Sequence, residues 1–223
     1  MREIVLDTET TGLDPAAGDR VVEVACLELV NHLPTGASFQ RYLNPERAMS
    51  ADVTAIHGLT DAFLADKPKF PEIAQELLDF LGDAQLVIHN AEFDLRFLNA
   101  ELGKIALPAL PPERAIDTLA LARRKFPGAS ASLDALCKRF NIDTSARNFH
   151  GALIDCDLLS KVYLELVGGR QASLGLAGAG GTEARAEAAA RGFRPARPHA
   201  PSAEELEAHE RMLKQLEKPL WLD

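Results

Sequence analysis

A long stretch rich in alanine and glycine divides the chain and limits which residues can form a core. Residues 168–200 hold 10 alanines and 7 glycines in 33 positions, with Phe193 as the one large apolar side chain after Leu176. Such a segment buries too little apolar surface to offset the conformational entropy lost on ordering. We therefore expect a folded domain at residues 1–167, a flexible linker at 168–200 and a short tail at 201–223.

The composition outside this stretch suits a globular, water-soluble chain. Apolar residues make up 47% of the sequence, but no apolar run approaches the ~20 residues that span a bilayer. No signal-peptide pattern opens the chain, which predicts a cytoplasmic protein with no membrane partner. The three cysteines lack metal-site spacing and are expected to be buried thiols. The net charge of −9 argues against a broad basic face for nucleic acid, although bound cations could still bring phosphates to the surface.

Hydrophobic periodicity over residues 1–167 predicts an α/β fold with a sheet of mixed strand direction. Three strand patterns come first, and strands then alternate with helices. The expected strands are residues 3–7, 20–30, 38–43 (the weakest pattern) and 86–88. The expected helices are residues 70–81, a helix from Ala91, and residues 117–124, 133–139 and 152–167.

Two acidic side chains end the first expected strand with one residue between them. Asp7 and Glu9 point to the same face, because side chains alternate along a strand. Adjacent anions at the end of a buried strand repel each other and lose hydration, and a bound divalent cation would remove both costs. A pair of solvated turn acids is the alternative.

A third acid lies on the apolar stripe of an expected helix. Asp94 shares a face with Phe97 and Leu98, whereas Glu92 lies on the polar side. Asn90 is a candidate N-cap, which places Asp94 near the first turn, where the helix dipole favours an anion. Asp94 is therefore either a site residue or an acid that only stabilises the start of this helix.

Asp155 repeats this arrangement near the end of the domain. It shares the buried stripe with Leu158 and Leu159, whereas Asp157 lies on the polar face. His150 precedes the helix, and we expect it on the entering loop, from which it can reach the same site. A lone histidine is usually structural, so the interest of His150 comes from its acidic neighbours.

Four inward-facing acids from three segments predict an oxygen-rich metal site. Such a site suits Mg²⁺ or Mn²⁺, and no thiolate or multi-histidine cluster indicates zinc. Paired cations among four carboxylates fit phosphoryl chemistry, in which one ion ionises a water and the other stabilises the leaving oxygen. A neutral His150 could accept the proton of that water.

Three short motifs occur in a fixed order: DTETTG at residues 7–12, HNAEFD at 89–94 and HGALID at 150–155. Together they resemble the motifs of the DnaQ-like, DEDDh group of 3′→5′ exonucleases. The resemblance continues through residues 53–59, 126–128 and 132–137, so it covers nearly all of residues 1–167. Within the group, the chain is most similar to the proofreading subunits of bacterial replicative DNA polymerases.

The resemblance implies a ribonuclease-H-like sheet flanked by helices, and removal of nucleoside monophosphates from the 3′ ends of single-stranded or frayed DNA. His150 is then the general base. The implied ligands of two Mg²⁺ or Mn²⁺ ions are Asp7, Glu9, Asp94 and Asp155. The implied substrate-binding residues are Asp7, Glu9, Asp52, His57 and Asp155, although the residues alone predict a loop at positions 52 and 57.

Two other functions stay open. The same motifs serve ribonuclease relatives, so the chain could be a free-standing 3′→5′ exoribonuclease. A non-catalytic polymerase scaffold that keeps the fold is the other alternative. Intact acids and an intact His150 argue against the scaffold, and the tail argues against the free-standing enzyme.

The tail contains two candidate binding elements. Residues 171–176 (QASLGL) resemble the short motif by which polymerase subunits bind the sliding clamp (beta), with contacts from Gln171, Leu174 and Leu176. A capping-box pattern at residues 202–205 then opens a short helix. Its apolar stripe and the single tryptophan predict an anchor on the polymerase catalytic (alpha) subunit, with folding back onto the domain as the alternative. The expected anchor residues are Leu206, Leu213, Leu216 and Trp221. A small accessory subunit is a further conceivable partner, and the expected location is the cytoplasm, at the nucleoid.

Overall fold

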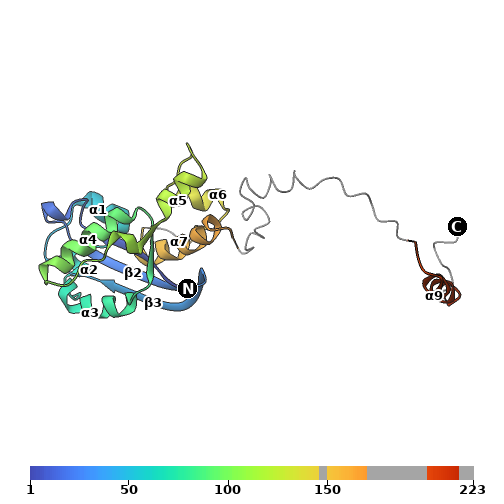
Figure 1. The fold of residues 1–223 in the computed structure, drawn as a ribbon. Coiled ribbons are helices and arrows are strands. Elements are labelled where there is room, and N and C mark those ends of the chain that lie inside the picture. The colour runs from blue at the N-terminus through green and yellow to red at the C-terminus, as the bar shows by residue number, and fades with distance from the viewer. Residues whose placement is uncertain (146–149, 170–199, 216–223) are drawn as a thin grey trace, which may run out of the picture. The chain divides into compact units, whose positions relative to one another are not determined.

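The computed structural model describes residues 1–145, 150–169 and 200–215 (Figure 1). The chain divides into two units, Met1–Ser173 and Leu174–Asp223. In the described ranges, no helix is both long enough and apolar enough to cross a bilayer.

Several of the expected tail features fall outside these ranges. Most of the expected linker, the clamp motif at residues 171–176 and the last eight residues are not described. The named residues concerned are Gln171, Leu174, Leu176, Leu216 and Trp221.

The first unit is built on a five-stranded mixed sheet in the order β3-β2-β1-β4-β5. Strand β1 pairs antiparallel with β2 and parallel with β4; β2 pairs antiparallel with β3, and β4 parallel with β5. The predicted mixed α/β sheet is therefore confirmed. The strands are β1 (Arg2–Thr10), β2 (Val21–Val30), β3 (Leu33–Tyr42), β4 (Gln85–Ile88) and β5 (Ala115–Asp117).

Helices cover both faces of this sheet. The helices of the first unit are α1 (Ala51–His57), α2 (Asp61–Leu64), α3 (Phe70–Leu81), α4 (Ala91–Lys104), α5 (Thr118–Lys125), α6 (Leu133–Arg139) and α7 (Ala152–Leu166), with short 3-10 turns η1 (Pro15–Ala17) and η2 (Pro112–Arg114). Helices α3, α5, α6 and α7 begin and end within one residue of the ranges predicted from periodicity, and α4 begins at the predicted Ala91.

The alternation of side chains along β1 sends its residues into two separate cores. Ile4 and Leu6 pack in one apolar cluster with residues of α3 and α4. Val5 lies in another cluster with Ala152 and Cys156 of α7. Odd-numbered residues of β1 therefore face α7 and even-numbered residues face α4, which decides where the acids at the end of this strand lie.

One expectation about local structure is wrong, and another is confirmed only in part. Residues 51–57 form helix α1 rather than a loop, because Ser50 caps its start and Gly58 ends it in a left-handed conformation with φ of 75°. Asn90 does stand at the N-cap of α4, but its φ of 68° is left-handed and its side chain makes no capping hydrogen bond. Instead its backbone N–H donates to Asp117 Oδ1 at 3.1 Å.

The described part of the second unit is helix α9 (Ala203–Leu213). Its start is the predicted capping box: Ser202 N–H donates to Glu205 Oε2 at 2.7 Å, and Glu205 N–H donates to Ser202 Oγ at 3.3 Å. Leu206 is 50% exposed, so at least part of the apolar stripe faces outward.

Candidate active site

Three of the four predicted acids meet at the end of β1. Asp7 and Glu9 both face α7, as strand alternation requires, and Asp155 approaches from that helix. One carboxylate oxygen from each residue lies within 4.8 Å of the others. This oxygen-only donor set fits a hard divalent cation.

The fourth acid reaches the strand from the opposite side. Asp94 is 3% exposed on α4, and its Oδ1 accepts a hydrogen bond of 2.7 Å from Thr8 Oγ1. Thr8 is even-numbered and faces α4, so Asp94 approaches the end of β1 from the α4 side, whereas Asp155 approaches it from the α7 side. It is nonetheless the strongest charged neighbour acting on Asp7.

Burial and mutual repulsion make this cluster costly to ionise. Burial first, and then the charges of Asp94, Glu9 and Asp155, hold the pKa of Asp7 well above its ordinary range. Burial raises the pKa of Asp94 from 3.8 to about 7, against the opposing hydrogen bond from Thr8. No lysine or arginine of the described ranges pairs with Asp7 or Asp94. A bound cation would supply the missing positive charge.

These pKa directions predict that the metal-free protein loses stability as pH rises. Between pH about 4 and about 7, the folded state holds more protons on Asp94 than the unfolded state does, so the free energy of unfolding falls with pH. Asp94→Asn should flatten this dependence, whereas exposed Asp157→Asn should not. Thermal unfolding of the chelated proteins across this pH range measures it, and parallel curves for wild type and Asp94→Asn would contradict the assignment.

His150 lies beside the cluster, on the loop that enters α7. Its Nδ1 is 3.3 Å from Asp155 Oδ2, and its side chain is 47% exposed. Its backbone N–H donates to the carbonyl of Ile56 at 3.2 Å, which ties this loop to α1. The structure therefore brings the predicted histidine to the predicted acid.

A pocket of about 290 Å³ opens next to Glu9. His57 of α1 lies in its wall, 5% exposed, and its Nδ1 accepts a hydrogen bond of 3.0 Å from Leu59 N–H. The proton of the neutral ring is therefore on Nε2, and burial lowers the pKa of His57, which favours that neutral form. Asp52 is exposed on the same helix and does not line this pocket. The lining residues are Thr8, Glu9, Thr10, Gly12, Leu13, Val53, Ile56, His57 and Phe93.

Comparison with known proteins shows which family the fold and its acidic site belong to. Residues 4–163 match the model of the family described as exonuclease (RNase_T). The chain belongs to this exonuclease family. The match includes all four acids and the whole sheet except the first two residues of β1.

Three curated relatives of this exonuclease share one name. A Rickettsia felis protein named DNA polymerase III subunit epsilon is 53% identical over 176 residues, covering 78% of this chain and 77% of the relative. A Salmonella typhimurium protein of the same name is 42% identical over 229 residues, covering 97% and 94%. The Escherichia coli protein of that name is 44% identical over 189 residues, covering 82% and 77%.

Solved structures of exonucleases have the same fold as this chain. Exonuclease X in complex with 5′ overhanging duplex DNA has a TM-score of 0.58 at 29% identity, over 74% of this chain and 90% of that one. The nuclease domain of 3′hExo, a DEDDh family member bound to rAMP, has a TM-score of 0.65 at 21% identity, over 74% and 91%, and supports the fold alone. The cluster of Asp7, Glu9 and Asp155 is the candidate metal site of this exonuclease fold.

One buried acid of the exonuclease site was not singled out from the sequence. Glu23 of β2 is 1% exposed and lies opposite Glu9 in the β1–β2 register. Its carboxylate accepts hydrogen bonds from Gln40 Nε2 at 2.7 Å and from Ala152 N–H at 3.2 Å, at the start of α7. It therefore satisfies the first turn of the helix that presents Asp155. The sequence signal that could have identified Glu23 is an acid at a core position of an apolar strand.

Glu23→Ala is expected to lower the free energy of unfolding by about 1–3 kcal/mol, because it leaves the Ala152 N–H buried without an acceptor and removes one of the two acceptors of the Gln40 amide. Glu23→Gln keeps one acceptor oxygen and should lose less than half as much. Urea unfolding of both variants measures the difference. Equal losses in the two variants would show that these hydrogen bonds are not what Glu23 contributes.

Proposed function

We propose that this exonuclease is the proofreading subunit of a bacterial replicative DNA polymerase, which removes mispaired 3′-terminal nucleotides as nucleoside monophosphates. The convergence of Asp7, Glu9 and Asp155 at the end of β1 carries the proposal, because this geometry suits phosphodiester hydrolysis. Alignment over 94% of a relative named DNA polymerase III subunit epsilon supports the polymerase context.

The proposed roles of the acids follow from their positions. Asp7, Glu9 and Asp155 would hold one Mg²⁺ or Mn²⁺ ion, and Asp94 together with Asp7 would hold a second. When bound, such ions supply a nucleophile at neutral pH and charge stabilisation for the leaving oxygen. The fold contributes rigid placement, since one strand and two helices fix the four carboxylates.

His150 is proposed as the general base. If its Nδ1–H donates to Asp155 Oδ2, Nε2 is the ring nitrogen that would accept the proton of the attacking water. The exposure of the ring gives that proton a route to solvent. Asp155 then has two functions, as a metal ligand and as the group that orients the base.

The pocket beside Glu9 is proposed to hold the 3′-terminal nucleotide. Val53, Ile56 and Phe93 offer an apolar wall for a base or sugar, and the buried Nε2–H of His57 is a hydrogen-bond donor in the same pocket. Asp52, on the exposed side of α1, stays a proposal from family resemblance alone.

The choice of DNA over RNA, and of mispaired over paired ends, is tested by comparing kcat/KM on matched substrates. We expect faster release from a mispaired DNA primer end than from a paired one, because fraying frees the terminal nucleotide to enter the pocket. Faster release from RNA than from DNA would favour the exoribonuclease alternative. Release from none of them would favour the scaffold.

The tail is proposed to hold the exonuclease domain near the polymerase, in the cytoplasm at the nucleoid. Residues 171–176 would bind the clamp, and residues 202–223 would bind the catalytic subunit, joined to the domain by the alanine- and glycine-rich segment. As a random coil, the residues between the clamp motif and the tail helix, 177–200, would span roughly 25–30 Å root-mean-square and would raise the local concentration of exonuclease at the primer end. The capping box of α9 and the exposure of Leu206 support a helix that docks on a partner.

Deletion of residues 202–223 is expected to release the protein from the catalytic subunit, with hydrolysis of short single strands unchanged. Gln171→Ala with Leu174→Ala should weaken only clamp binding. Size-exclusion co-elution and direct titration with the purified subunits measure both effects. Full retention of the truncated protein on the polymerase would place the main contact on the folded domain.

A further inference from the structure

Five basic residues of the exonuclease domain differ from its other lysines and arginines in the partners that they contact. Elsewhere in the described parts of residues 1–169, eight lysines and arginines pair with carboxylates, and the two others, Arg96 and Arg114, bond to backbone carbonyls. The five on α5 and α6 pair with no carboxylate of the described residues. They are exposed in a chain of net charge −9. These residues are Arg123, Arg124, Lys125, Lys138 and Arg139.

Two of the five form other local contacts, which account for the presence of a basic residue at these positions. Lys125 Nζ donates to the carbonyls of Glu165 and Leu166 at 2.9 Å each, at the end of α7. Arg139 lies over the Phe126 ring, 4.5 Å from its centroid. Three basic side chains on the two helices have no such partner among the described residues: Arg123, Arg124 and Lys138, which we call the α5–α6 basic face.

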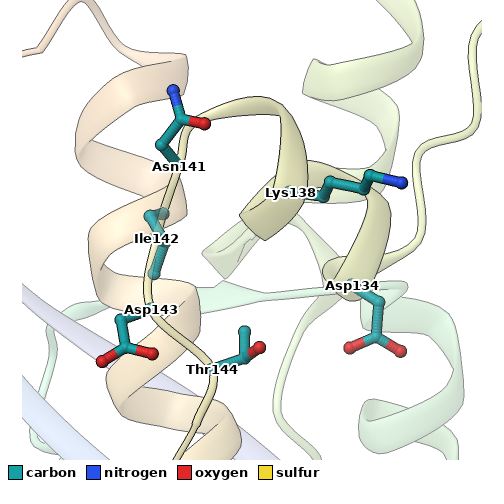
Figure 2. Close-up of a pocket in the computed structure, with 6 residues that line it drawn as sticks. All are labelled: Asp134, Lys138, Asn141, Ile142, Asp143 and Thr144. Atoms are coloured by element: carbon teal, nitrogen blue, oxygen red, sulfur yellow. The ribbon is translucent and has the colours of Figure 1, made fainter.

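Lys138 lies beside acids without pairing with them. It lines a surface hollow of about 610 Å³ with Asp134 of α6 and with Asp143 on the segment that follows (Figure 2). Neither carboxylate forms an ion pair with Lys138. This hollow contains none of the catalytic acids and is distinct from the pocket beside Glu9.

The basic face is anchored to the elements that form the active site. An apolar cluster that includes Ala122 of α5 and Leu136 of α6 packs these helices against α7, the helix of Asp155 (Figure 1). At the other end of α5, Asp117 accepts from the backbone N–H of Asn90, just before α4 and its catalytic acid. Burial mainly, and also the positive charge of Arg123, lower the pKa of His89 in the same motif.

We propose that Arg123, Arg124 and Lys138 bind the phosphates of the single strand that leads into the active site. The proposal rests on the proposed function and adds to it a basic surface that binds the strand several nucleotides from its 3′ end. Basic side chains without carboxylate partners are free to replace the counterions of a nucleic acid backbone, which gives affinity without sequence preference. The acidic remainder of the surface would keep the strand on this one path.

The test compares a triple variant, Arg123→Gln, Arg124→Gln, Lys138→Gln, with a control of equal charge change, Arg41→Gln, Lys67→Gln, Lys69→Gln. Each control residue pairs with a carboxylate in the structure. Binding of fluorescent single-stranded DNA of about 4 and about 20 nucleotides is measured by anisotropy in chelator over a salt series, and kcat/KM is measured with Mg²⁺. Thermal unfolding checks that each variant is folded.

We expect the triple variant to bind the longer strand ~10-fold more weakly, with a salt slope smaller by about 2, at about 0.7 for each phosphate that is no longer neutralised. The gain in kcat/KM from short to long DNA should shrink in parallel, and the control should behave as wild type. Wild-type affinity and slope in the folded triple variant would overturn the proposal. An equal change in the control would overturn it too, since net charge alone would then explain the effect. Absence of hydrolysis by the wild type would instead contradict the proposed function, and the anisotropy would still test the basic face.

Discussion

Asp7→Ala is expected to lower the rate of 3′-nucleotide release by about 10³-fold or more while the domain stays folded. Asp7 is the acid on which the charges of Asp94, Glu9 and Asp155 all act, so its loss removes a proposed metal ligand that is central to the whole cluster. Metal-ion stabilisation of a phosphoryl transition state contributes several kcal/mol, and each 1.36 kcal/mol is tenfold in rate. Removing one anion also relieves repulsion, so the metal-free variant should be at least as stable as wild type.

The matched control is Asp157→Ala on the same helix as Asp155. Asp157 is exposed and pairs with Lys161 at 2.7 Å, so its loss should change activity less than twofold. Asp155→Ala should reproduce the loss seen for Asp7→Ala. Retained activity in either active-site variant would remove the two-metal proposal, and global unfolding of both would make these acids structural residues.

His150→Gln is expected to lower kcat by roughly 10²-fold or more, because glutamine keeps a hydrogen bond to Asp155 but cannot accept the proton of the attacking water. The pH profile is the sharper readout. The variant should lose the part of the wild-type pH dependence that proton acceptance by this ring contributes. An unchanged rate and profile would mean that the metal alone ionises the water.

Much of the fold and site could be predicted because it depends on periodicity. The apolar repeat of α3 and the alternation along β1 are local properties, and they correctly placed Asp7 and Glu9 on one face. Helical spacing likewise separated buried Asp155 from exposed Asp157.

The remainder depends on tertiary structure that one chain segment does not encode. Helix α1 has seven residues and, in the described structure, buries only His57, so no apolar stripe marks it. Which face of the sheet α4 covers is set by packing, and this is why Asp94 reaches the site through Thr8, apart from the other three acids. Glu23 is an unexpected acid in an apolar strand, and its role is evident only from the hydrogen bond that it accepts from the Ala152 N–H at the start of α7.

The most direct test of the central claim is digestion of 3′-labelled single-stranded DNA by the purified full-length chain. With Mg²⁺ or Mn²⁺, the account predicts that the first labelled product is a nucleoside monophosphate and that the strand shortens one nucleotide at a time from its 3′ end. Chelator should stop the reaction, and added cation should restore it. Undiminished cleavage in chelator, internal cuts, or no release of label with either cation would contradict it.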